Sequence, residues 1–227
     1  MLNTISNMIT SSNYQQTTIA SLLTRNIPRD LIMGVEDALI TGAKRGFSAG
    51  SDMNEGHRPH AVGQMRHFHM NETFRDALEV AGGNPSGLKG NRIVTGTSGI
   101  FTLGRFNVTN GVWNNGRRSR GRREMALANI AIEPLVTPDL FEKYKPASKA
   151  TVFFVGVFES ANGGNASQPI SIDVVVPDHQ LQNWLFKASI RSVLALYEPE
   201  IDNQQVDLAI PLLKSNIGSG NHQVSGT

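Results

Sequence analysis

Two stretches in the second half of the chain are dominated by residues that favour β-strands. Residues 151–159 (TVFFVGVFE) and 170–176 (ISIDVVV) are rich in Val, Ile and Phe, and a loop of Gly, Asn and Ser at residues 161–168 separates them. This pattern is typical of two strands joined by a wide hairpin. Strands that follow one another as a hairpin run in opposite directions, so the pattern predicts an antiparallel sheet.

A second hairpin is predicted earlier in the chain. Residues 92–97 and 100–109 flank Ser98-Gly99, a dipeptide typical of a tight turn. Residues 206–213 are expected to form a last strand, and Pro211 would confine that strand to the edge of the sheet. We therefore expect an antiparallel sheet of about five strands, made of two hairpins and an edge strand.

Helical patterns are concentrated in the first half of the chain. Residues 28–44 begin with a proline suited to a first helical position, and the small residues from Gly46 to Gly56 are expected to end that helix. Residues 59–70 form another candidate. Asn71 resembles the N-cap of a separate helix, which would stop at Gly82-Gly83.

Further helices are predicted in both halves of the chain. Asp178 is expected to cap a long helix that ends before Pro199. Shorter candidates are residues 18–25, the segment from Met125 to just before Pro134, and residues 137–145. About five helices packed on an antiparallel sheet define the α+β class. We expect a single α+β domain over residues 17–214, with a weakly ordered N-terminal arm at 1–16 and a flexible tail at 215–227.

The composition excludes several classes of protein. Of the 227 residues, 39% are hydrophobic and 18% are charged, as in an ordinary globular domain. The chain contains no Cys, so it has neither disulfides nor thiolate metal ligands. No apolar run approaches the roughly 18–20 residues that span a bilayer. The first residues lack the layout of a signal peptide, and we expect a cytoplasmic protein without a membrane partner.

The main functional signal is a basic stretch from Val80 to Arg123. It contains no Asp or Glu and carries eight positive charges, although the formal net charge of the whole chain is +2. Five arginines fall within residues 117–123, directly before a helical pattern. The start of a helix already has partial positive charge, so arginines there are unfavourable unless an anion is bound nearby. A polyanion is the first candidate for the partner.

We therefore predict a protein that binds nucleic acid or processes its phosphodiester bonds. Trp113 is a candidate for stacking on a base, and arginines are candidates for binding phosphates. The predicted contact residues are Arg58, Arg66, Arg92, Arg105, Trp113, Arg117, Arg118, Arg120, Arg122 and Arg123. The sequence does not distinguish DNA from RNA or from a smaller anion. As alternatives, the basic stretch docks the acidic C-terminal half of a second copy in a homo-oligomer, or is a solvated loop.

Four of the six histidines lie within thirteen residues, from His57 to His69. On a helix, His60 and His67 share one face because seven residues make about two turns. His57, His60 and His67 are therefore candidates for a catalytic site, with neighbouring arginines stabilising negative charge. With Asp52 or Glu55, the same histidines are the ligands of a possible divalent metal in a hydrolase, although their spacing matches no metal motif. The remaining alternative is that these histidines are polar surface or packing residues.

Overall fold

The computed structural model describes residues 18–110, 113–136, 147–159 and 166–197. Five strands form one sheet in the order β1-β2-β3-β4-β5. Their bounds are β1 (Thr95–Ser98), β2 (Phe101–Thr109), β3 (Ala150–Phe158), β4 (Ser171–Pro177) and β5 (Trp184–Ser189). Every neighbouring pair is antiparallel except β2 and β3, which are parallel. The α+β class and the two hairpins β1–β2 and β3–β4 are confirmed.

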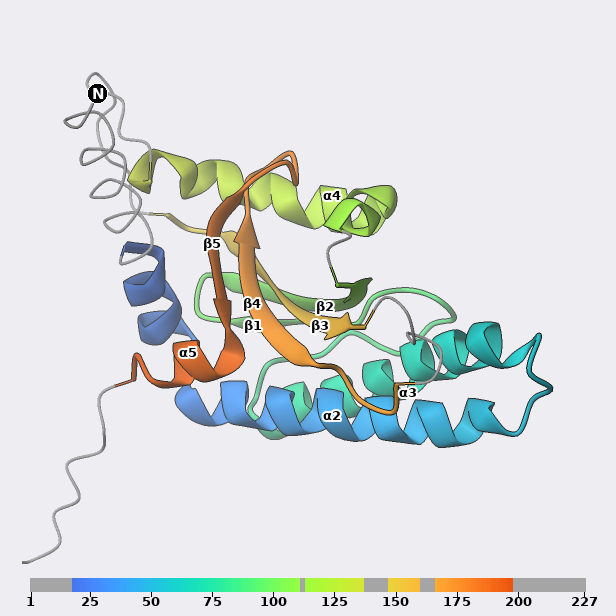
Figure 1. Ribbon diagram of the computed structural model, residues 1–227. Helices are drawn as coiled ribbons and strands as arrows, with labels where there is room; N and C mark the ends of the chain where they lie inside the picture. Colours follow the sequence, from blue (N-terminus) through green and yellow to red (C-terminus); the bar gives the residue numbers. More distant parts are fainter. Residues whose placement is uncertain (1–17, 111–112, 137–146, 160–165, 198–227) are drawn as a thin grey trace, which may run out of the picture. The chain divides into compact units, whose positions relative to one another are not determined.

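The parallel pair β2–β3 was not predicted, and it determines how the chain covers the sheet. Parallel neighbours need a connection that crosses a face of the sheet. Here the crossover contains η1 (Trp113–Arg118), α4 (Arg120–Ala126), η2 (Leu127–Ala131) and η3 (Glu133–Leu135). The helix predicted to start at Met125 thus starts five residues earlier, at Arg120 of α4, and continues from Leu127 as the 3-10 helix η2. In Figure 1 the crossover and the long helices lie on opposite sides of the sheet.

The other face is covered by a hairpin of two long helices, α2 (Arg29–Ser51) and α3 (Arg58–Val80). The prediction that α2 would end at Gly46 is wrong, and so is the division of α3 at Asn71. Gly46 has its α-carbon so close to α3 that a Cβ there would lie 2.5 Å from the backbone nitrogen of Arg66. The glycines of α2 therefore do not end the helix. They allow the backbone of α3 to pack closely against it.

Two apolar clusters lie on the two faces of the sheet, because alternate side chains of a strand point in opposite directions. Phe154 of β3 belongs to the cluster beneath the long helices, where its ring contacts Phe74. Phe153 belongs to the cluster under the crossover and contacts Phe106. The strand β3 is buried along its whole length. Phe101 and Phe106 lie on opposite faces of β2, because five positions separate them and side chains alternate along a strand.

The predicted long helix after Asp178 is wrong. The segment forms β5 and then the short helix α5 (Ile190–Leu194). Leu181 adopts a positive φ of 56°, which a regular α-helix does not allow. Asp178 instead closes the loop before β5, since its carboxylate accepts hydrogen bonds from the backbone N–H groups of Gln182 at 2.6 Å and Asn183 at 2.9 Å. The hydrophobic run of this segment completes the sheet beside β4.

Several predictions fall on residues outside those described, namely the arm at 1–16, the helix at 137–145, the strand at 206–213 and the tail at 215–227. The predicted helix at 18–25 is present, since residues 18–26 are helical. Within the described ranges, no helix combines the length and apolar character needed to cross a bilayer.

Candidate functional site

The structure divides the arginines of the 117–123 segment among different surroundings. The helix α4 begins at Arg120, and Ser119 is its N-cap, accepting a hydrogen bond from the backbone N–H of Arg122 at 3.4 Å. Thus Arg117 and Arg118 end the 3-10 helix η1, whereas the other three lie in the first turns of α4. A helix turns by about 100° per residue, so consecutive arginines cannot share one direction.

Arg117 and Arg122 hold the crossover against the sheet. The Nε of Arg117 donates to the carbonyl oxygen of Leu181 at 2.7 Å. The Nε of Arg122 donates to the carbonyl oxygen of Gly116 at 2.9 Å, and its guanidinium carbon lies 4.6 Å from the centroid of the Phe106 ring. Partial burial lowers the pKa of Arg122. These two side chains therefore have structural partners within the chain.

Arg92, Arg118, Arg120 and Arg123 are exposed and form a different group. Arg120 is paired with Glu124 at 2.7 Å, so the segment's charge is partly neutralised. Among the described residues, no Asp or Glu forms an ion pair with Arg92, Arg118 or Arg123. A groove of about 800 Å³ runs between residues 91–95 and the start of α4. Its lining includes Arg92, Arg120 and Glu124.

Arg105 is a buried member of a polar network under β2. Only 2% of its surface is exposed. Its Nε donates to the side-chain oxygen of Asn71 at 2.8 Å, and its Nη2 donates to the carbonyl oxygen of His67 at 2.8 Å. Burial lowers the pKa of Arg105 to about 9, and the positive charge of Arg122 adds to that effect. A polymer cannot reach this guanidinium without unpacking α3 from the sheet.

Arg66 and Arg58 also have contacts within the chain. Arg66 is 5% exposed, donates to the carbonyl oxygen of Ala166 and lies 4.1 Å above the Phe158 ring. Arg58, at the start of α3, donates from Nε to the carbonyl oxygen of Met53 at 3.3 Å. Neither side chain lines the groove beside α4.

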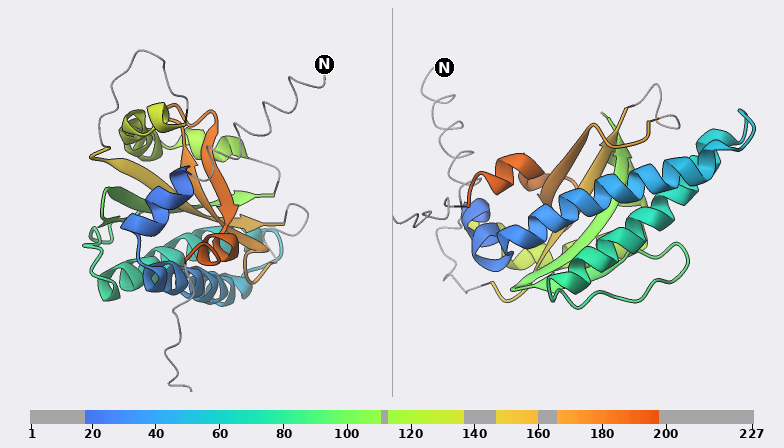
Figure 2. Two further views of the ribbon diagram at one scale, coloured as in Figure 1. Left: turned by 90° about the vertical axis from the view of Figure 1, so that its left-hand side faces the viewer. Right: turned by 90° about the horizontal axis from the view of Figure 1, so that it is seen from below.

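The three candidate histidines do not converge. His57 and His60 are exposed near the connection between α2 and α3, which projects beyond the strands in Figure 2. His67 lies about 10 Å farther along α3 than His60. Its Nδ1 is 3.3 Å from the Nη2 of Arg105, and burial followed by the charge of Arg105 lowers the pKa of the imidazole. His67 is thus a packing residue of the buried network.

A metal site on these histidines is not formed in the described part of the chain. No group of three or more His, Cys, Asp or Glu side chains lies close enough there to hold a metal ion. The predicted ligands His57, His60 and His67 with Asp52 or Glu55 all lie in the described part of the chain. The physical reason is that α3 is straight, so its histidines are separated along its axis.

Trp113 has a neighbour that the sequence did not point to. Its indole contacts the rings of Phe106 and Trp184. The sequence predicts a helix at Trp184, and only the position of Trp184 in β5 brings it to Trp113. Aromatic residues separated by seventy positions give no local signal that they meet.

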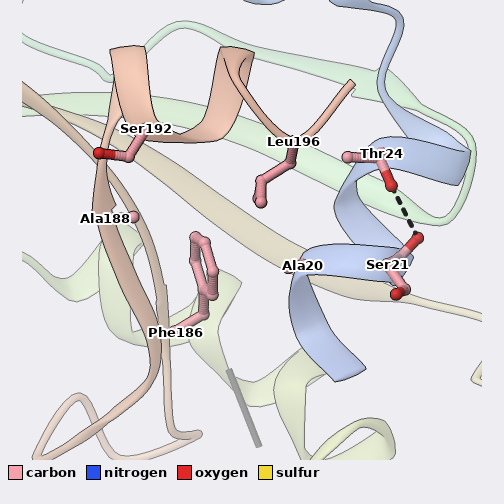
Figure 3. A pocket seen from close by; sticks show the side chains of 7 residues that line it. All are labelled: Ala20, Ser21, Thr24, Phe186, Ala188, Ser192 and Leu196. Carbon is pink, nitrogen blue, oxygen red and sulfur yellow. Dashed lines mark hydrogen bonds between the residues drawn. The ribbon is translucent and has the colours of Figure 1, made fainter. Parts of the chain in front are cut away.

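A separate apolar cavity of about 320 Å³ lies between the helix at 18–26 and the β5–α5 segment. Figure 3 shows Phe186 and Leu196 lining it opposite Ala20. It has no charged side chain in its lining, so it does not qualify as a site for a polyanion.

Comparisons with known proteins gave no family model, curated protein or solved structure that matches this chain.

Proposed function

We propose that this protein binds the phosphate backbone of nucleic acid through its exposed arginines. The contact residues of this proposal are Arg92, Arg118, Arg120 and Arg123. The observation that carries it is the absence of an acidic partner for Arg92, Arg118 and Arg123 among the described residues. Two of the four contact residues, Arg92 and Arg120, also line the groove beside α4. Arginine is suited to phosphate because its guanidinium offers paired N–H donors in one plane.

The arginines that bond within the chain have another role in this proposal. Arg105 and Arg66 stabilise the packing of α3 on the sheet, and Arg117 and Arg122 orient the crossover. The proposal is binding and not cleavage, because the candidate histidines are spread along α3. Contact through phosphates alone is independent of base sequence.

The number of arginines sets the expected salt dependence. Each neutralised phosphate contributes a slope of about −0.7 to −0.9 to the dependence of log K on log salt concentration. Four contacts therefore predict an affinity loss of about 100-fold between 50 and 200 mM salt. Fluorescence anisotropy of a labelled oligonucleotide measures this loss directly.

The decisive variant replaces Arg92, Arg118, Arg120 and Arg123 with Ala together. The matched control replaces four exposed basic residues of the helical layer, Arg25, Arg29, Lys44 and Arg45, with Ala. Both variants lose the same charge, so a non-specific effect of net charge would weaken binding equally. The proposal predicts that only the first variant loses binding, and full affinity in that variant refutes it.

One observation favours a second candidate, self-association. A groove between α2 and α3 is lined by the exposed carboxylates Asp30, Asp37 and Asp76 and by one basic residue, Arg45, so its net charge is negative. The exposed arginines of one copy docking this groove of another would make a head-to-tail contact. Light scattering on protein free of nucleic acid distinguishes the two candidates, because such an assembly dissociates into monomers as salt rises. A mass of one chain at low salt excludes it.

A further inference from the structure

A small pocket lies on the crossover face of the sheet, between η1 and the strands β2, β3, β4 and β5. Its volume is about 280 Å³. Val155, Val157 and Val175 give it an apolar floor, and the indoles of Trp113 and Trp184 form one wall. This is slightly below the range of about 300–1,000 Å³ for ligand pockets, so it suits an occupant of about one ring system.

The polar groups of the pocket lie on the neighbouring strands. Asp173 of β4 and Lys187 of β5 form an ion pair at 3.5 Å, and the Lys187 ammonium lies 5.7 Å from the Trp184 ring centroid. Ser171 also lines the pocket. An apolar floor, an aromatic wall and a few hydrogen-bonding groups are what a flat heteroaromatic ring requires.

The pocket is linked by direct contacts to the arginine segment, residues 117–123. Trp113 begins the 3-10 helix that ends at Arg118. Arg117 donates to the carbonyl oxygen of Gln182 at 3.1 Å, two residues before Trp184. On the other side, Phe106 lies between the guanidinium of Arg122 and the Trp113 ring, with centroids of the two rings 5.3 Å apart. The geometry therefore joins a ring-sized pocket to a segment with exposed positive charge.

We propose that this pocket takes one base of a single-stranded nucleic acid whose phosphates lie along the arginine segment. The proposal rests on the proposed function and narrows it to a class of nucleic acid. Bases in a duplex are stacked and paired, so their faces cannot enter a pocket, whereas those of a single strand are free to stack on an indole. The charge of Lys187 is already paired with Asp173, so burying a phosphate over the apolar floor would be costly.

The tryptophans provide a direct test, because Trp113 and Trp184 are the only two in the chain. Fluorescence excited at a wavelength that the three tyrosines do not absorb therefore reports on the two indoles of the pocket wall. Three probes of equal length are titrated: a dT12 single strand, the corresponding duplex, and a 12-mer that carries abasic sites in place of its bases. We expect quenching by dT12 and none by the duplex or the abasic strand, although all three carry phosphates for the arginines.

The matched variants are Ile170→Glu and Met33→Glu. Both residues are exposed, at 54% and 39%, so neither change disturbs the core. Ile170 lines the pocket, whereas Met33 lies on α2. Loss of one base–aromatic stack corresponds to a weakening of about 10-fold. Anisotropy with labelled dT12 should show that loss for Ile170→Glu only, while binding of the abasic strand is equal in both variants.

The outcomes separate the two proposals. If dT12 and the abasic strand bind equally and neither alters the fluorescence, the base pocket is refuted while phosphate binding stands. If no probe binds wild-type protein at low salt, the proposed function fails and the base pocket with it. If Met33→Glu weakens dT12 as much as Ile170→Glu does, the effect is one of charge, which also refutes the pocket.

Discussion

Replacing Gly46 with Ala should destabilise the protein, although Ala is the better helix former. In a helix interior, Ala is favoured over Gly by about 1 kcal/mol. At this position, however, the added Cβ would lie 2.5 Å from the nitrogen of Arg66 and 2.8 Å from the carbonyl carbon of Met65. These atoms belong to the backbone of α3, so no side chain can rotate away. The helices must separate or bend.

Overpacking of this kind costs about 1–3 kcal/mol, and more where a backbone must shift. Subtracting the gain of about 1 kcal/mol in helix propensity leaves an expected net loss of up to about 2 kcal/mol in the free energy of unfolding. For a chain of this size, Tm falls by about 2–4 °C per kcal/mol. Urea denaturation followed by circular dichroism measures the change. The added methyl group hardly alters the surface that unfolding exposes, so the slope of the transition with urea concentration should be unchanged.

Gly63→Ala is the matched control, because Gly63 lies in α3 and a Cβ there would meet nothing within 4 Å. This variant should gain stability, by up to about 1 kcal/mol. Opposite signs for the two variants support close packing of α2 on α3. A Gly46→Ala protein at least as stable as the wild type would refute the reasoning.

Three further predictions concern buried polar groups. Asn129→Ala should cost about 2–5 kcal/mol in urea denaturation, because the fully buried amide bonds the backbone of Thr151 in both directions, at 2.6 and 3.1 Å. The pKa of His67 is lowered in the folded protein, so below about pH 6.5 the unfolded chain is protonated first and the free energy of unfolding falls. His67→Gln should flatten this part of the dependence of unfolding free energy on pH. Tyr197 donates to the carbonyl of Ile27 at 2.6 Å and its pKa rises to about 12, so folding stability should decline above pH 10 in wild type and less in Tyr197→Phe.

The candidate site was only partly predictable. The sequence indicated that arginines are concentrated between Val80 and Arg123, but not which of them remain exposed. Burial of Arg105 depends on Asn71 and His67, which come from a helix more than thirty residues away. Hydrogen bonds of this kind have no local pattern, so an arginine that packs a core and one that contacts solvent look alike in the sequence.

Local periodicity determined what the sequence alone could specify: the hairpins β1–β2 and β3–β4, the start of α2 after Pro28, and the α+β class. These features follow from contacts between residues close along the chain. Tertiary structure decided the parallel pairing of β2 with β3, the strand at Trp184–Ser189, and the unbroken course of α3 through Asn71. In each case the deciding contact is with a distant segment: the open edge of β4 is paired by β5, and Arg105 takes up the Asn71 side chain that would otherwise cap a helix.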